Sequence, residues 1–180
     1  MKLNRLVLSA LISSALLSAG AMAADTGTIT FTGSITGTTC DVSVGNGGAD
    51  ATVLMGDGSE AALVNAGDVD GDTRFSMRLA NCSGVTAAKA FFHQGDTVTA
   101  QGRLSNTADP ADAARNVTLQ LRDSQGVINL GDTSQLDGAA GYVAITGGAA
   151  ELPYVVQYHS EGGTTAGAVT SQVVYSIAYP

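Results

Sequence analysis

The sequence predicts an all-β domain, and three observations support this prediction. Short runs in which apolar and polar residues alternate recur along the chain, separated by Gly, Asn and Asp. Such period-two patterning places successive side chains on opposite faces of a half-buried sheet. No amphipathic stripe with the helical period continues for about ten residues. The 23 glycines among 180 residues supply the turns of an antiparallel sandwich.

The N-terminus carries the pattern of a secretory signal peptide. Lys2 and Arg5 provide a positive start, and an apolar run over residues 6–17 follows. Ala21-Met22-Ala23 then matches a small-x-small cleavage site. A transmembrane anchor is the alternative, but serines interrupt the run and it is short for a bilayer span. We therefore expect a signal peptide over residues 1–23, followed by export.

The mature chain is predicted to contain strands in order along its length. A helical turn is expected only at residues 109–114 and 59–65, and Asp123-Ser124-Gln125-Gly126 is expected to form a turn. No internal repeat and no charged or Pro-rich linker divides the chain, so a single domain is expected. The alternating runs cover residues 28–32, 74–79, 116–121, 152–158 and 172–179.

Cys40 and Cys82 are the only cysteines. An even number of cysteines in an exported chain indicates one disulfide bond. A reactive or metal-binding pair is the alternative, but there is no C-x-x-C motif, and neither histidine lies near a cysteine in the sequence. We therefore predict a structural disulfide between Cys40 and Cys82.

The charge balance argues against binding to nucleic acid. The chain has 8 basic and 16 acidic residues, a formal net charge of −8, and removal of Lys2 and Arg5 with the signal peptide makes it −10. A chain without a basic stripe cannot release phosphate counterions, and it is not suited to an anionic membrane surface. We expect no nucleic-acid partner.

Patterns that could carry catalysis or metal binding are weak. Residues 68–72 place carboxylates at positions 1, 3 and 5 of an EF-hand-like loop. Thr73 stands where that loop needs Gly, and Leu79 where it needs Glu, so a solvated turn is the preferred interpretation. His93 and His159 form no paired motif, and no G-x-S-x-G elbow is present. We expect no enzymatic activity, no metal and no cofactor.

An ordered set of segments resembles the pilin subunits of type 1-like fimbriae, which the chaperone–usher pathway assembles. The resemblance covers essentially the whole mature chain and includes a tyrosine next to the last residue. The Ala51 to Gly56 segment resembles a strand of the family that ends in Leu/Met-Gly. The segments, in order, are 27–35, Cys40, 51–56, 75–82, 117–123, 153–158, 166–169 and 173–179.

The resemblance implies an incomplete immunoglobulin-like β-sandwich that lacks its final strand. Donor-strand complementation completes such a fold: a chaperone fills the groove first, and the N-terminal extension of the next subunit then replaces it. The implied partners are a periplasmic pilus chaperone, an outer-membrane usher and neighbouring fimbrial subunits in a homopolymer. The implied division is a signal peptide at 1–23, a donor-strand extension at 24–32 and a pilin domain at 33–180.

The resemblance assigns the donor strand to Gly27, Ile29 and Phe31. These residues share one parity and face one side of a strand. Gly27 takes the small position over a shallow part of the groove, and Ile29 and Phe31 fill deeper pockets. Asp25 departs from the family, which usually begins engagement with a smaller or apolar residue.

The resemblance assigns the last strand, which borders the groove and pairs with the chaperone, to the C-terminus. The terminal carboxylate of Pro180 is expected to be held by basic chaperone residues, although proline lacks the N–H donor that the family more often has there. An ordinary closing strand is the alternative. The residues of this strand that share one parity are Val173, Tyr175, Ile177 and Tyr179.

These observations predict a structural, repeating subunit of a fimbria on the bacterial cell surface that is exported through the periplasm and supports adhesion. Two alternatives remain open. One is a minor adaptor or a single-domain adhesive subunit of the same fibre. The other, from a different class, is a monomeric secreted carbohydrate-binding sandwich, although the absence of Trp argues against sugar binding.

Overall fold

Strands dominate the computed structural model, which describes residues 30–32, 37 and 39–180. The chain divides into a unit of residues 1–35 and a unit of residues 36–180, and the elements below lie in the second. The strands are β1 (Thr39–Val44), β2 (Val69–Ser83), β3 (Ala87–Phe92), β4 (Leu104–Ser105), β5 (Val117–Asp123), β6 (Gly126–Val127), β7 (Val143–Ala144), β8 (Ala150–Ser160) and β9 (Tyr175–Ala178), and the 3-10 helices are η1 (Glu60–Ala62) and η2 (Thr133–Leu136).

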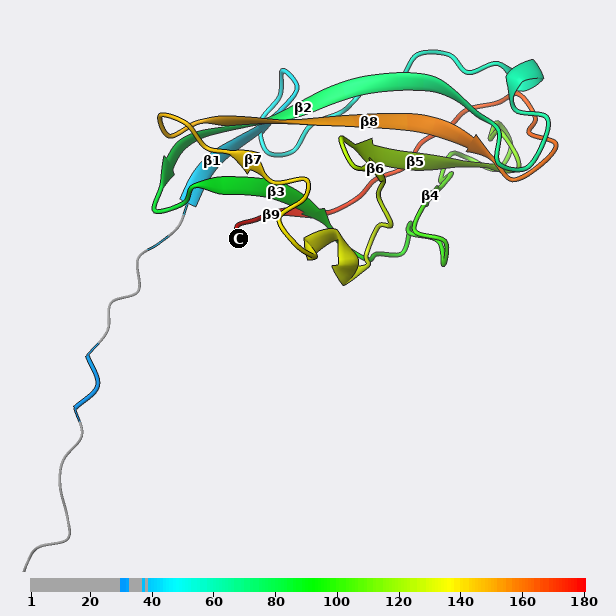
Figure 1. The fold of residues 1–180 in the computed structure, drawn as a ribbon. Helices are drawn as coiled ribbons and strands as arrows, with labels where there is room; N and C mark the ends of the chain where they lie inside the picture. The colour runs from blue at the N-terminus through cyan, green and yellow to red at the C-terminus, as the bar shows by residue number, and fades with distance from the viewer. Residues whose placement is uncertain (1–29, 33–36, 38) are drawn as a thin grey trace, which may run out of the picture. The chain divides into compact units, whose positions relative to one another are not determined.

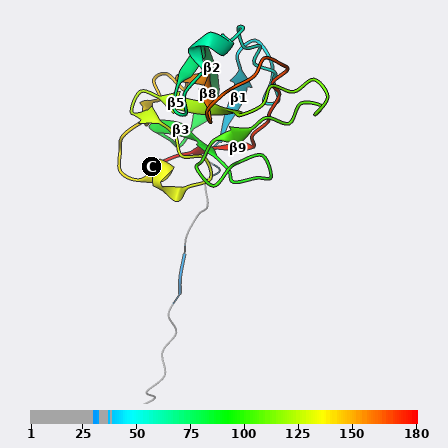
Figure 2. The same cartoon turned by 90° about the vertical axis from the view of Figure 1, so that its right-hand side faces the viewer.

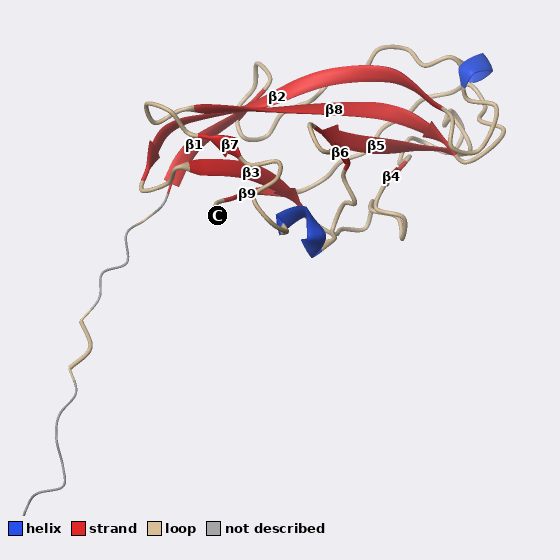
Figure 3. Ribbon diagram, in the orientation of Figure 1, coloured by secondary structure: helices blue, strands red, loops and turns tan. Residues whose placement is uncertain are grey.

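The strands form two antiparallel sheets. One has the order β1-β2-β8-β5-β4, with β6 added to β5, and the other has the order β7-β3-β9. Figures 1 and 3 show β2 and β8 running together above β3 and β9. The predicted all-β architecture is confirmed, and the long alternating runs at residues 74–79 and 152–158 lie in its two longest strands.

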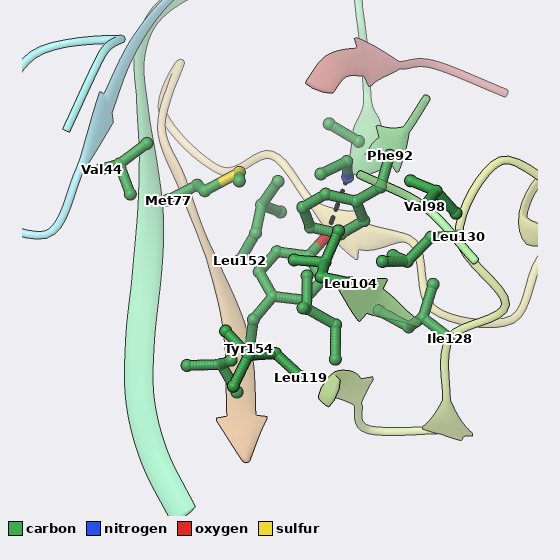
Figure 4. Close-up of a cluster of buried hydrophobic side chains, with 14 of the residues drawn as sticks. Val44, Met77, Phe92, Val98, Leu104, Leu119, Ile128, Leu130, Leu152 and Tyr154 are labelled. Atoms are coloured by element: carbon green, nitrogen blue, oxygen red, sulfur yellow. Dashed lines mark hydrogen bonds between the residues drawn. The ribbon is translucent and has the colours of Figure 1, made fainter. Parts of the chain in front are cut away.

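The core lies between the sheets and combines inward residues of the alternating runs, such as Met77 and Leu152, with residues from outside those runs, such as Phe92 (Figure 4). Phe92 is 1% exposed, and its ring meets that of Tyr154 edge-on with centroids 5.3 Å apart. The Tyr154 hydroxyl accepts a hydrogen bond of 2.9 Å from the Ala90 N–H. Burial raises the pKa of Tyr154 to about 12, so its hydroxyl stays neutral inside the core.

The acidic segment at residues 68–72 is not the turn that the sequence predicts. Residues 69–72 belong to β2, and the register against β8 shifts between Asp70 and Thr73. Gly71 has φ 68° at this irregularity, a conformation that favours glycine. The carboxylates bind backbone instead: Asp70 accepts a hydrogen bond of 2.7 Å from the Ser59 N–H. Pairing with β8 therefore overrides the local turn signal.

The other local turn predictions are confirmed. Residues 123–126 form the expected turn, in which the Asp123 carboxylate accepts bonds from Gln125 N–H and Gly126 N–H. Residues 59–65 contain η1 as expected. Residues 109–114 form the expected helical turn, in which the Asp109 carbonyl accepts a hydrogen bond from the Ala113 N–H. Among the described residues, no helix is long and apolar enough to cross a membrane.

Candidate subunit-pairing site

The C-terminal segment forms an edge of the smaller sheet. β9 pairs with β3 in the register Ala90↔Ile177 and Phe92↔Tyr175. The contact continues before β9, where the His93 N–H donates to the Val174 carbonyl at 2.9 Å. Within residues 39–180, β9 has β3 as its only strand neighbour. The other edge of β9 therefore presents backbone groups that no described strand pairs (Figure 2).

The side chains of this segment alternate as the sequence predicts. Val174 is 72% exposed, whereas its neighbours of the opposite parity pack against the core. Pro180 is exposed at the end of the segment. The partly buried apolar residues of one parity are Val173, Tyr175, Ile177 and Tyr179.

A second segment with free backbone groups follows β1, and we call residues 49–56 the strap. Its side chains alternate, because Val53 and Met55 pack against the core while Leu54 is 85% exposed. The sequence predicts a strand at residues 51–56, but the structure assigns none. Residues 50–55 make no backbone hydrogen bond to any described residue. A strand needs a ladder partner, and no described segment supplies one.

The hydrogen bonds of the strap to the rest of the described chain lie only at its two ends. The Tyr175 hydroxyl donates to the Ala49 carbonyl at 2.7 Å, which connects β9 to the start of the strap. The Tyr158 hydroxyl donates to the Gly56 carbonyl at 3.0 Å, and the Gly56 N–H donates to the Thr73 hydroxyl. Sequence reasoning missed the two tyrosine contacts, because hydroxyl partners more than 100 residues away leave no local pattern.

The strap and the C-terminal segment together offer two features to another chain. Each has backbone N–H and C=O groups without a partner among the described residues. The two segments, together with β1 and β2, also carry apolar side chains that the core only partly covers. A strand laid along such edges could satisfy the backbone groups and cover those side chains. The partly buried apolar residues from these two segments and from β1 and β2 are Cys40, Val42, Val53, Met55, Phe75, Cys82, Val173, Tyr175, Ile177 and Tyr179.

The predicted disulfide is present. Cys40 and Cys82 are bonded, with their Cα atoms 4.2 Å apart. The bond connects the beginning of β1 to the end of β2, beside the paired residues Thr39 and Ser83. It therefore holds β1 on β2 at the end of the strand where the chain enters the sandwich.

The predicted donor strand lies mostly outside the described residues. Gly27 and Ile29 fall in that part of the chain, so the structure does not bear on them. Phe31 is described and is 89% exposed. A phenylalanine with so little cover has apolar surface left for another molecule to bury.

The most densely connected polar cluster lies at the ends of β5 and β8. Arg103 binds the Glu161 carboxylate through Nε and Nη2 at 3.0 to 3.2 Å. The Thr118 hydroxyl donates to Glu161 at 2.8 Å, and His159 Nδ1 lies 3.3 Å from it. Burial raises the pKa of Glu161, but these hydrogen bonds and the charges of Arg103 and His159 outweigh it and lower the pKa. The cluster is an ion-pair network, and no described group of His, Cys, Asp and Glu is arranged to hold a metal ion.

We expect Glu161→Gln to remove part of the acid sensitivity of the fold. A carboxyl whose pKa is lowered by folding stabilises the fold above its unfolded pKa, and this contribution disappears as the pH falls through its folded pKa. Wild type should therefore be more stable than Glu161→Gln near neutral pH, and the difference should shrink towards about pH 3. Urea unfolding across this range measures the effect. Glu151→Gln is the control, because Glu151 lies 3.9 Å from Arg78 in an exposed pair; a constant difference at all pH values would contradict the prediction.

Sequence comparison places the chain among fimbrial proteins. The profile of the type-1 fimbrial protein A family matches residues 55–180. The major fimbrial subunit SMF-1 of Stenotrophomonas maltophilia is 40% identical over 164 residues, which cover 88% of this chain and 95% of that protein. The F17 fimbrial protein of Escherichia coli is 36% identical, covering 90% of this chain and 92% of that protein.

Solved structures share the fold. A chaperone–usher pilus structure superimposes with a TM-score of 0.58 at 17% identity, covering 86% of this chain and 96% of the other. The P pilus rod subunit PapA superimposes with a TM-score of 0.56 at 15% identity, covering 78% of this chain and 99% of the other. The predicted immunoglobulin-like sandwich is thereby confirmed. The chain therefore belongs to the type-1 fimbrial protein family and is a structural subunit of a fimbria.

Proposed function

We propose that this subunit accepts a strand from a neighbouring copy between its strap and its C-terminal segment, and donates residues 24–32 to the next copy. The observation that carries the proposal is the pair of unpaired edges, at residues 50–55 and at β9, which carry partly buried apolar side chains and are connected by the bond from the Tyr175 hydroxyl to the Ala49 carbonyl. An isolated sandwich with two such edges is prone to pair with another chain. A donated strand supplies both the ladder bonds and the missing apolar cover.

The donor strand has side chains suited to packing against these apolar residues. Gly27 admits close approach of the backbone, and Ile29 and Phe31 lie on the same side of the strand. Full burial of each large side chain would contribute about 1.5–3 kcal/mol. Thr30 and Thr32, both exposed, would face outwards. In this proposal residues 1–23 are the signal peptide and residues 33–180 are the receiving domain.

Before assembly the same edge needs a temporary partner. We assign this role to a periplasmic pilus chaperone that pairs with the C-terminal segment and binds the Pro180 carboxylate, and transfer to the cell surface to an outer-membrane usher. The exposed Pro180 and the unpaired edge of β9 support this order of events. The fibre would be a homopolymer in which each subunit completes its neighbour.

A gel experiment tests the proposal. Fibres purified from the cell surface should run as a ladder of SDS-resistant oligomers when unheated and should collapse to one subunit band after boiling. The reason is that an inserted strand can leave only by breaking its whole ladder and exposing its apolar side chains. A single subunit band from unheated fibres would contradict strand donation while leaving the family assignment intact.

A further inference from the structure

The strap lacks the contacts that normally hold an edge strand in place. Its residues 50–55 have no backbone hydrogen bonds to the rest of the described chain. A hollow of about 890 Å³ is lined by residues 50–54 of the strap and by residues 73–76 of β2, and the strap packs on the core through Val53 and Met55. The Tyr175 hydroxyl donates to the Ala49 carbonyl at one end of the strap, and the Tyr158 hydroxyl donates to the Gly56 carbonyl at the other.

Both tyrosines are well placed to act as tethers. The Tyr158 ring is enclosed by two glycines, because a Cβ atom on Gly58 or on Gly71 would lie 2.7 or 2.6 Å from its Cδ2 atom. Tyr175 stands on β9, which is hydrogen-bonded to β3. Burial and the nearby Asp50 carboxylate raise the pKa of Tyr175, so its hydroxyl keeps the donor proton at neutral pH.

We propose that Tyr175 and Tyr158 are positioning residues for strand donation: their hydroxyls hold the strap extended so that an incoming strand meets a ready edge. This inference rests on the proposed function. A free segment of this length would lose backbone entropy when a strand pairs with it. Holding both ends in advance reduces that loss, which is how preorganisation strengthens and speeds binding. Tyr175 is the more informative of the two, because its hydroxyl connects the β9 edge directly to the strap.

The test is strand uptake by Tyr175→Phe, with Tyr179→Phe as the matched control. Tyr179 lies in the same segment with the same parity, but its hydroxyl bonds to no described residue. Mature subunits are purified as complexes with their assembly chaperone and mixed with a labelled peptide of residues 24–35. The rate at which the peptide replaces the chaperone is then measured by fluorescence anisotropy. We expect Tyr175→Phe to slow uptake by about 2- to 10-fold, the effect of one net hydrogen bond, and Tyr179→Phe to match wild type.

A second measurement separates positioning from general stability. Amide hydrogen exchange in β8 and the thermal midpoint should be the same in Tyr175→Phe as in Tyr179→Phe, so that slower uptake does not come from a less stable domain. Tyr158→Phe should give the same pattern. Equal uptake rates for Tyr175→Phe and Tyr179→Phe would overturn the positioning role, and so would slower uptake accompanied by faster amide exchange in β8. Either result would leave the proposed function intact. A wild-type complex that takes up no peptide would overturn the proposed function, and the inference with it.

Discussion

Phe31→Asp is expected to abolish fibre formation while leaving the subunit folded. The substitution removes an apolar side chain that strand donation would bury, and it places a carboxylate in the same pocket. Loss of the phenylalanine costs about 1.5–3 kcal/mol, and burial of an unpaired charge costs several kcal/mol more. Together these terms reduce strand donation by more than about 100-fold. Electron microscopy and the yield of surface fibres measure the effect.

The control for this variant is Thr32→Asp. Thr32 is the next residue and is exposed, and its side chain points to the opposite face of the strand. It introduces the same charge without a burial cost, so fibres should form. The chaperone complex of Phe31→Asp should be recovered from the periplasm at the wild-type level, because the donor strand is used only in exchange. Normal fibres from Phe31→Asp would show that the donor strand is assigned to the wrong residues.

Replacing both cysteines by serine is expected to lower the free energy of unfolding by about 4 kcal/mol. The bond between Cys40 and Cys82 closes a loop with a sequence separation of 42 residues. Opening this loop restores conformational entropy to the unfolded chain, which is the source of the effect in the chain-entropy model. The loss also frees the start of β1 from β2. Urea unfolding of the subunit complemented by the peptide of residues 24–35 measures this loss in the free energy of unfolding.

Wild type treated with a reducing agent is the control for the cysteine variant. Reduced wild type differs from untreated wild type only in the open disulfide bond. Its unfolding midpoint should therefore move towards that of Cys40→Ser/Cys82→Ser. A thiol count on denatured, untreated wild type should find both cysteines oxidised. Two free thiols, or equal midpoints for all three samples, would contradict a structural role for the disulfide.

Residues that alternate regularly were predicted well, and residues that do not were missed. The runs at 74–79 and 152–158 lie in β2 and β8, because one buried face imposes the alternation directly on the sequence. β3 was missed, because Ala87–Phe92 has apolar residues on both faces and a lysine between them. Lys89 is 5% exposed, donates to the Ala140 carbonyl and lies 4.4 Å from the centre of the Tyr142 ring. A loop distant in sequence covers this face of β3, so no local pattern records it.

The candidate pairing site was likewise predicted only in part. The parity of the C-terminal residues was readable, because Val173 to Tyr179 must turn one face to the core whatever lies beyond it. The conformation of the strap was not readable, because residues 51–56 have the composition of a strand but have no ladder partner among the described residues.

Alternation along the chain was sufficient for the all-β class and the two cysteines for the disulfide, while the ordered set of segments carried the resemblance to fimbrial subunits. The unpaired edges, and the reach of Tyr175 to Ala49, depend on which strands lie beside each other. Hydrogen bonds between distant segments form only when the core brings those segments together, so the three-dimensional arrangement alone established them.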